Sequence, residues 1–282
     1  MKKLKTLFIA SLLATNIAIA GETINLGAVF DTAKNLIQSQ TTANISDSEE
    51  IAIGRNVTAS TLGAYPLIKD EALQRKLNRI GVWIAMQSPR PELPWRFAAV
   101  ESSSINAFAA PGGIIMITRG MLNNVANEAE LGCVIGHEIG HVSRRHHLSV
   151  LQKSQLADAG TSALSISSKT AGSAQMGKQL LDESKTLFTH ALDRSAEREA
   201  DEDGVLLAAK AGYDPGACLI FMQRLASTKQ ESSALEELYK THPTAQERTE
   251  NVEGALRKLK GAEPGEGARP EFVAFKSAGK KK

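Results

Sequence analysis

The strongest constraint on the fold is an apolar helical stretch that begins near Asn127 and contains the run His137-Glu138-Ile139-Gly140-His141. Asn127 followed by Glu130 is a typical capping pair for the first turn of a helix. Most other side chains of the stretch are apolar, so we expect the helix to be buried. Its two histidines and Glu138 would then lie in or near the interior, where polar groups need partners. A metal ion is a partner that satisfies all three.

The spacing of His137 and His141 is that of an H-E-x-x-H zinc site. Side chains four residues apart share one face of a helix, so both imidazoles can bind one tetrahedral zinc ion. Glu138 lies about 100° round the helix, where it reaches a water molecule on the metal rather than the metal itself. Zinc lowers the pKa of that water to about 7, and the carboxylate takes its proton during attack on a peptide carbonyl. The pattern predicts a peptidase with one zinc ion per chain and Glu138 as the general base.

Two sources of a third zinc ligand are open on this pattern alone. The longer pattern H-E-x-x-H-x-x-G-x-x-H ends at His147, but Arg144 occupies the position that requires glycine. We expect Arg144 to continue the helix and to turn His147 away, so that His146 and His147 form a basic helix end favoured by the helix dipole. The alternative is an acidic residue from a later helix, as in sites with two histidines and one glutamate.

Glu197 and Asp201 are the acidic residues that fit the second alternative, because they lie four residues apart on one helix face. Glu197 would bind the metal, and Asp201 would accept a hydrogen bond from a histidine ligand. Glu199 is rotated about 200° from Glu197 and is expected to face elsewhere. Taken alone, the segment also fits a solvated, charged helix face.

Several further motifs accompany these residues in a fixed order. They are residues 105–113 (INAFAAPGG), residues 118–120 (TRG), the acidic run at 197–201, residues 211–215 (AGYDP), Thr241-His242-Pro243 and Arg248. Over about residues 46–256 this order resembles metallopeptidase family 48, the gluzincin-type zinc endopeptidases. The resemblance implies that His137, His141 and Glu197 bind zinc and that Glu138 is the general base.

The resemblance also implies roles for three residues beyond the ligands. Asp201 corresponds to an acidic residue that is often assigned as a proton donor. Since an aspartate bonded to a histidine ligand stays ionised, we expect it to hold that histidine instead. His242 is expected near the metal, as a cap on it or as a group that steadies the oxyanion, and Arg248 is a second candidate for the oxyanion. A loop-packing role for His242 stays open.

Three β-rich segments, at 95–101, 105–110 and 114–118, predict a small antiparallel sheet next to the zinc-binding helix. We expect the segment 114–118 to lie at a sheet edge and to pair with extended substrate through main-chain hydrogen bonds. Gly112 and Gly113 would let another backbone approach closely at its start. An ordinary core strand with a turn is the open alternative. The predicted substrate-binding residues are Asn106, Gly112, Gly113 and Ile115.

Helical periodicity on both sides of these strands predicts an α+β, predominantly helical fold, and the resemblance implies a zincin-like metalloprotease domain over residues 46–260. Residues 1–20 combine early lysines, an apolar run and small residues at their end, which is typical of a signal peptide cleaved before Gly21. Residues 21–45 are expected to be an N-terminal extension and 261–282 a flexible tail. Residues 157–177, rich in small side chains, predict a loose helical hairpin or a lid.

The signal peptide predicts a periplasmic protein without a membrane span after cleavage. Lysine and arginine number 33 against 31 acidic residues, so no basic surplus indicates a nucleic-acid binder. An oxidising compartment permits a bond between Cys133 and Cys218, but we expect two buried free thiols.

The resemblance implies polypeptide substrates, namely misfolded or stalled envelope proteins, and a role in protein quality control. The competing hypothesis is a non-proteolytic periplasmic chaperone or binding module in which zinc is structural. Glu138 favours the enzyme, because a structural zinc site has no use for an acid aimed at water.

Overall fold

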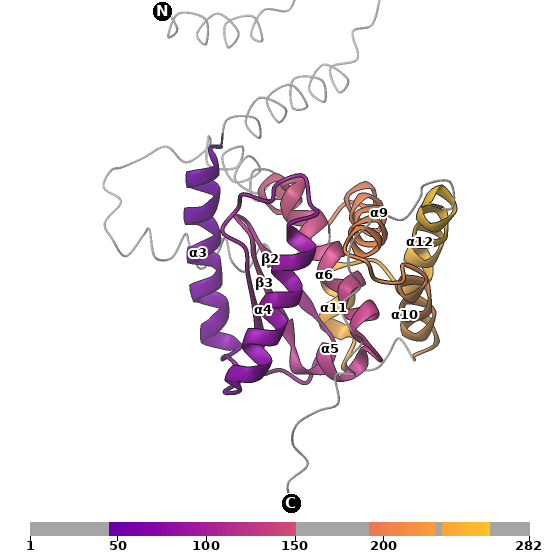
Figure 1. Cartoon of the computed structure of the whole chain (residues 1–282). Helices are drawn as coiled ribbons and strands as arrows, with labels where there is room; N and C mark the ends of the chain where they lie inside the picture. Colours follow the sequence, from indigo (N-terminus) through magenta and orange to yellow (C-terminus); the bar gives the residue numbers. More distant parts are fainter. Residues whose placement is uncertain (1–44, 151–191, 229–232, 260–282) are drawn as a thin grey trace, which may run out of the picture. The chain divides into compact units, whose positions relative to one another are not determined.

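The computed structural model describes residues 45–150, 192–228 and 233–259 (Figure 1). The predicted signal peptide, the N-terminal extension up to residue 44, the segment 157–177 and the tail lie outside the described residues. The described part consists mainly of helices around one small sheet, as predicted. Not one helix in this part of the chain combines the length and the apolar character that a membrane span requires.

The sheet contains β1 (Arg96–Val100), β2 (Ala107–Ala110) and β3 (Ile114–Thr118), close to the predicted segments. Their order is β1-β3-β2, so β3 is the central strand. β2 and β3 are antiparallel as predicted, but β1 and β3 are parallel, and the sheet is mixed. The loop 101–106 carries the chain past β3 to the far edge. Thr118 at the end of β3 holds this loop, because its hydroxyl lies 2.6 Å from the carbonyl oxygen of Ser104.

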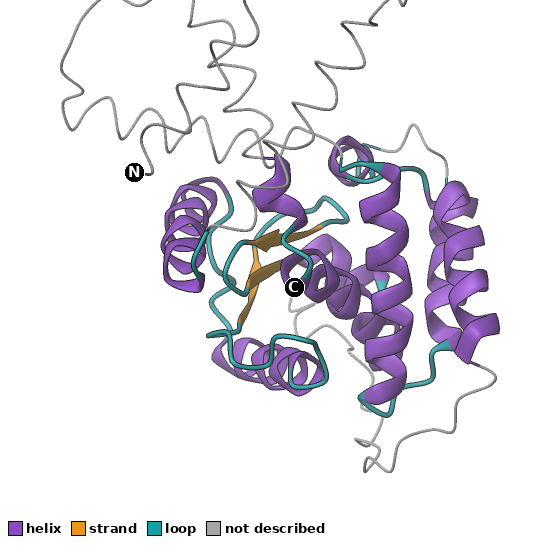
Figure 2. Ribbon diagram, turned by 90° about the horizontal axis from the view of Figure 1, so that it is seen from above, coloured by secondary structure: helices purple, strands orange, loops and turns teal. Residues whose placement is uncertain are grey.

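Two N-terminal helices flank the sheet. α3 (Asp47–Ala64) begins after Ser46, which forms a capping box with Glu49. α4 (Glu71–Ala85) is capped by Asp70 and packs its apolar face against β1. Seen from above, helices lie on both sides of the small sheet (Figure 2).

The C-terminal helices are built on α6 (Glu128–Ser143), the helix that starts at the predicted capping residue Asn127. α6 packs against α9 (Arg194–Lys210), and α9 packs against α12 (Ala245–Leu259) (Figure 1). An added Cβ on Gly136 of α6 would lie 2.9 Å from the carbonyl oxygen of Gly204 on α9, so the two backbones are in contact. Side chains of α9 therefore lie next to the histidines of α6. Three further helices are α5 (Arg119–Asn124), α10 (Gly216–Ser227) and α11 (Glu236–Thr241), and residues 146–150 are also helical.

Cys133 on α6 and Cys218 on α10 form a disulfide bond. The expectation of two free thiols is therefore wrong. The two Cα atoms lie 5.3 Å apart although 85 residues separate them along the chain. Only the packing of α10 against α6 brings them together, and no local pattern signals it. Because Cys133 lies one helical turn before His137, the bond anchors the histidine-bearing helix.

A buried carboxylate joins α3 to the turn between β2 and β3. Glu50 is fully buried and accepts hydrogen bonds from Arg90 at 2.9 Å and from the backbone N–H of Gly112 at 3.0 Å. Arg145, beyond the end of α6, adds a third contact, with its Nε 3.0 Å from Glu50. Gly112 has a φ of +76°, a conformation that favours glycine. The turn is thus held in place by α3.

Gly54 lets α3 approach this turn, and we expect Gly54→Ala to destabilise the protein. An added Cβ would lie 1.7 Å from the carbonyl oxygen of Pro111, a backbone atom that cannot move alone. Overpacking of this kind costs about 1–3 kcal/mol. The free energy of unfolding, measured by denaturant titration, should fall by that amount.

Gly63→Ala is the matched control, because Gly63 lies in the same helix and an added Cβ there meets nothing within 4 Å. This change should raise the free energy of unfolding by up to about 1 kcal/mol, since alanine is the better helix former. Equal stabilities of the two variants would contradict the close contact between α3 and the turn.

Candidate metal centre

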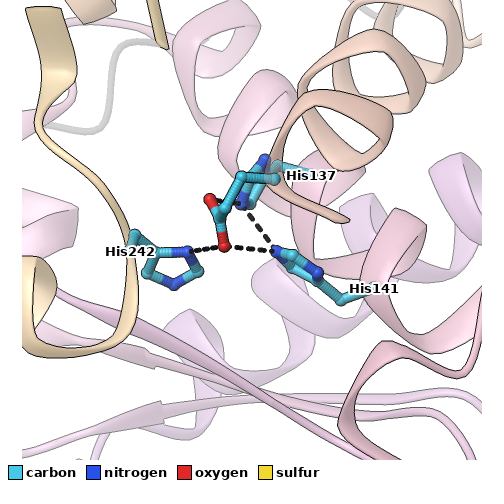
Figure 3. A group of neighbouring side chains, drawn as sticks. His137, His141 and His242 are labelled. Carbon is cyan, nitrogen blue, oxygen red and sulfur yellow. Dashed lines mark hydrogen bonds and ion pairs between the residues drawn. The ribbon is translucent and has the colours of Figure 1, made fainter. Parts of the chain in front are cut away.

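Four buried side chains from three parts of the chain converge on one point (Figure 3). His137 and His141 come from α6, Glu197 comes from α9, and His242 directly follows α11. One nitrogen or oxygen atom of each residue lies within 4.8 Å of the corresponding atoms of the other three. Because these groups are at most 5% exposed, they need polar partners in one another or in a shared cation.

The distances fit a shared metal ion. The Nε2 atoms of His137 and His141 lie 2.9 Å apart, and Glu197 Oε1 lies 3.5 Å from His141 Nε2. Glu197 Oε2 is buried and has no hydrogen-bond partner among the described residues. Zinc bonds of about 2.0–2.2 Å place tetrahedral ligand atoms roughly 3.3 Å apart, close to these separations. Two imidazoles and one carboxylate also form a ligand set that suits zinc.

One of the two candidate third ligands belongs to the cluster and the other does not. Glu197 lies in the cluster, whereas His147 is not part of it. α6 ends at Ser143, so the expectation that Arg144 continues the helix is wrong. The helix stops without a glycine because Arg145 adopts a φ of +59° and turns the chain back.

His146 and His147 do not form a charged helix end. Burial lowers the pKa of both imidazoles, to about 3 for His147. His147 Nε2 is buried and has no hydrogen-bond partner in the described ranges. The expectation from the helix dipole is wrong here, because the loss of hydration outweighs a favourable dipole.

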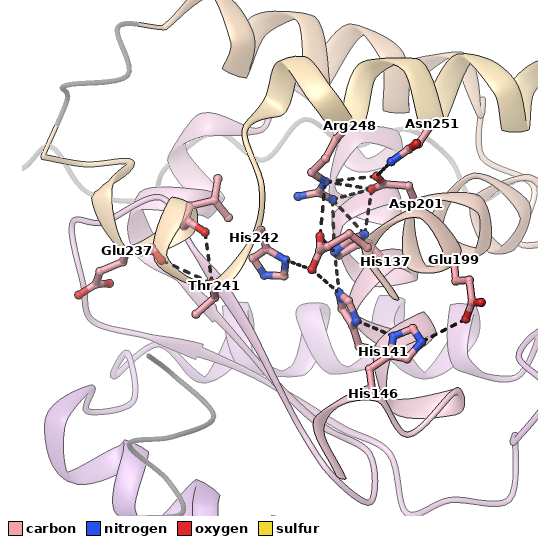
Figure 4. A network of polar contacts seen from close by, with 12 residues as sticks. His137, His141, His146, Glu199, Asp201, Glu237, Thr241, His242, Arg248 and Asn251 are labelled. Atoms are coloured by element: carbon pink, nitrogen blue, oxygen red, sulfur yellow. Dashed lines mark hydrogen bonds and ion pairs between the residues drawn. The ribbon is translucent and has the colours of Figure 1, made fainter. Parts of the chain in front are cut away.

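Asp201 lies on the side of His137 that faces away from the cluster (Figure 4). Its Oδ1 atom is 3.1 Å from His137 Nδ1 and 2.7 Å from a nitrogen of Arg248, and Asn251 donates to Oδ2 at 3.1 Å. Burial alone would raise the pKa of Asp201. The nearby Arg248 and His137 have a larger, opposite effect, so the net pKa lies well below the ordinary range. When a metal occupies Nε2 of His137, the ionised Asp201 is the acceptor beside its Nδ1–H, and a nitrogen of Arg248 lies 2.9 Å from the same Nδ1.

Arg248 on α12 is buried between two carboxylates. It is bonded to Asp201, and its Nε lies 3.8 Å from Glu197 Oε2. Burial alone would lower the pKa of Arg248, but Asp201 and Glu197 raise it, so the guanidinium stays charged. Sequence reasoning missed Asn251, whose position three residues after Arg248 on the same helix was the available signal.

His242 donates a hydrogen bond from Nδ1 to Glu197 Oε1 at 2.9 Å. Burial raises the pKa of Glu197, but His242, Arg248 and His137 together lower it to about 2. The same two effects shift the pKa of His242 in the opposite directions. Burial lowers its pKa, Glu197 raises it more, and the net pKa lies above its ordinary value. The hydrogen bond between these two residues thus favours the ionised form of Glu197 and the protonated form of His242.

Glu138 lines a small cavity beside the cluster, and Asn106 is the chain neighbour of another residue that lines it. Glu138 lines this cavity of about 30 Å³ together with His137, His242 and Ala107 of β2. Asn106 directly precedes Ala107 and accepts its backbone N–H at 2.9 Å. The Nδ2 of Asn106 is buried without a hydrogen-bond partner in the part of the chain that is described. A donor therefore remains unused next to the residues that line the cavity.

The other predicted substrate-binding residues lie elsewhere. Ile115 belongs to β3, whose two edges are already paired with β1 and β2, so β3 cannot add a substrate strand. The N–H of Gly112 is bonded to Glu50, and an added Cβ on Gly113 would lie 3.3 Å from the ring of Trp95. Both glycines pack within the fold. The sheet edge that contacts α6 belongs to β2 instead.

Comparisons with known proteins identify a family and several relatives of this chain. The model of peptidase family M48 matches residues 69–256. The beta-barrel assembly-enhancing protease of Yersinia pestis is 28% identical over 262 residues, which cover 90% of this chain and 53% of the relative. The protein of the same name from Escherichia coli (strain K12) is 26% identical, with 83% of this chain and 49% of the relative covered. The mitochondrial metalloendopeptidase OMA1 of Arabidopsis thaliana is 30% identical, with 65% and 36% covered. The chain spans about half the length of the two bacterial relatives.

Proposed function

Since this chain belongs to peptidase family M48, a family of zinc metallopeptidases, we propose that it cleaves internal peptide bonds of polypeptides with Glu138 as the general base. The convergence of His137, His141 and Glu197 on one buried point carries the proposal. This arrangement is that of a gluzincin, in which a glutamate from a later helix completes an H-E-x-x-H site.

The residues of the proposed metal site have different roles in hydrolysis. Zinc, when bound by His137, His141 and Glu197, supplies a Lewis acid that polarises the scissile carbonyl and activates water. Glu138 takes the proton of the attacking water and passes it to the leaving amine. His242 donates a hydrogen bond to the developing oxyanion, and in the absence of substrate it donates to Glu197.

Asp201 and Arg248 are positioning residues in this proposal. Asp201 holds the Nδ1–H of His137, and the positive charge of Arg248 keeps the buried Asp201 and Glu197 carboxylates ionised. We prefer this role of Arg248 to the oxyanion role that the sequence suggests, because its guanidinium is already bonded to Asp201.

We propose further that an extended substrate lies along the outer edge of β2. Two observations support this placement. β2 contacts α6, and Asn106, whose Nδ2 has no hydrogen-bond partner among the described residues, directly precedes Ala107, which lines the cavity together with Glu138. A substrate carbonyl would accept this hydrogen bond while the strand edge binds the substrate backbone.

The proposed context is the periplasm, with misfolded or stalled envelope proteins as substrates. The signal-peptide pattern of residues 1–20 supports export. The disulfide between Cys133 and Cys218 suits an oxidising compartment. The bacterial relatives are named for the assembly of beta-barrel proteins, which supports an envelope substrate.

Removal of the metal is expected to abolish cleavage of fluorescently labelled casein by the purified protein. Activity should fall by at least about 100-fold after dialysis against a chelator, since the charge stabilisation that a metal supplies is worth several kcal/mol. One equivalent of Zn²⁺ should restore it. Mg²⁺ should not, because a nitrogen-rich ligand set does not suit a cation that prefers oxygen.

The same assay separates the peptidase from the competing chaperone. If the zinc-loaded protein prevented aggregation of an unfolded protein but left casein intact, a binding module with a structural zinc would replace our proposal.

A further inference from the structure

The two nitrogens of His141 face opposite ways (Figure 4). Nε2 faces the metal cluster, 2.9 Å from His137 Nε2. Nδ1 faces away from it and lies 2.9 Å from Nδ1 of His146. The nitrogen that does not face the cluster is therefore bonded to a second histidine, not to a carboxylate.

The end of α6 explains how a residue so close in sequence returns to His141. The helix stops at Ser143, and the left-handed conformation of Arg145 reverses the chain. His146 is thereby buried next to the last helical turn, with 9% of its surface exposed. Its other nitrogen, Nε2, lies 3.3 Å from Oε2 of Glu199 on α9.

Metal binding fixes the direction of these hydrogen bonds. A metal-bound Nε2 carries no proton, so the proton of His141 is on Nδ1 and is donated to Nδ1 of His146. His146 then carries its own proton on Nε2 and donates it to the Glu199 carboxylate. With these tautomers each ring nitrogen of His141 and His146 has a partner. The last acceptor in the chain of hydrogen bonds is the Glu199 carboxylate.

We propose that His146, with Glu199 behind it, is a positioning residue that fixes the ring orientation and the tautomer of the metal ligand His141. The inference rests on the proposed metal centre. It also completes a pattern on α9, because Asp201 holds His137 directly and Glu199 holds His141 through His146. The helix that supplies the ligand Glu197 thus also orients both histidine ligands.

Zinc affinity tests this role without relying on catalysis. The purified metal-free protein is titrated with Zn²⁺ in competition with a chromophoric chelator. His146→Ala should weaken zinc binding by about 10–100-fold, the usual effect of losing such a partner. His146→Asn retains an acceptor oxygen at the position of Nδ1 and should recover most of the affinity. Glu199→Gln removes the charge but keeps an acceptor, so its loss should be smaller than that of His146→Ala.

Cobalt spectra and a control variant complete the test. Co²⁺ substituted into His146→Ala should give a shifted visible absorption band, because one imidazole ligand is no longer held in orientation. Glu202→Gln is the matched control, since Glu202 also lies on α9 but pairs with Lys258 at 2.9 Å, and its zinc affinity should equal that of the parent.

Two results would overturn the inference while leaving the metal centre intact. One is a parent-like zinc affinity of folded His146→Ala. The other is an equal loss of affinity in His146→Ala and His146→Asn, which would point to packing and not to the hydrogen bond. A parent protein that bound no zinc would remove the centre and this inference together.

Discussion

Replacing Glu138 with glutamine is expected to reduce casein cleavage by about 10²–10⁴-fold, the usual contribution of a general base. Glutamine has nearly the same shape as glutamate but cannot take a proton from water. Glu138 lines the cavity beside His137 and does not belong to the group of metal-binding side chains. The bound zinc, measured by elemental analysis, should therefore remain at one ion per chain.

Glu71→Gln provides the matched control for this loss. Glu71 is exposed on α4, where its only described ion pair is with Arg75 one helical turn away, so its substitution should leave cleavage unchanged. Equal activity of the parent and Glu138→Gln would end the peptidase proposal. Loss of activity together with loss of zinc would instead assign Glu138 to the metal site.

Removal of the disulfide is expected to be the largest single loss of stability. The double variant Cys133→Ala and Cys218→Ala opens a bond between residues 85 positions apart. A closed loop of this length stabilises a protein by about 4–5 kcal/mol, mainly by restricting the unfolded chain. Denaturant titration should show a fall of that size in the free energy of unfolding.

Reduction of the parent protein supplies the control. A reductant should destabilise the parent to the level of the double variant and should have no effect on the variant itself. Two reactive thiols in the unfolded, unreduced parent would show that the cysteines are free in solution and would contradict the bond. Because Cys133 lies one turn before His137, we also expect the zinc affinity to fall when the bond is absent.

The parts of the site that depend on helix periodicity could be predicted from the sequence. The four-residue spacings of His137 with His141 and of Glu197 with Asp201 define shared helix faces without any tertiary information. The helix cap at Asn127 could be predicted for the same reason, because it depends only on residues that are close in sequence. In each case the relevant residues are neighbours along one helix, and the structure brings the two pairs together.

Features that depend on distant partners could not be predicted in this way. The disulfide and the parallel pairing of β1 with β3 arise from elements brought together only by the packed core. The end of α6 is the clearest example. Arg145 adopts a conformation unusual for a side chain of its size, and it does so where its guanidinium reaches Asp47 at 2.6 Å and Glu50 at 3.0 Å. Those contacts come from α3, about 100 residues earlier, so the sequence around Arg145 contains no sign of them.

The glycine contact between α6 and α9 has a consequence for how the protein tolerates change. At Gly136 and Gly204 main-chain atoms of one helix are in contact with those of the other. Van der Waals contact between backbone atoms therefore sets the distance between the two helix axes. Substitutions elsewhere in the interior change side-chain volumes, but they do not change the residues that set this interhelical distance. The spacing of the carboxylate on α9 from the imidazoles on α6 therefore depends on the absence of side chains at Gly136, Gly140 and Gly204.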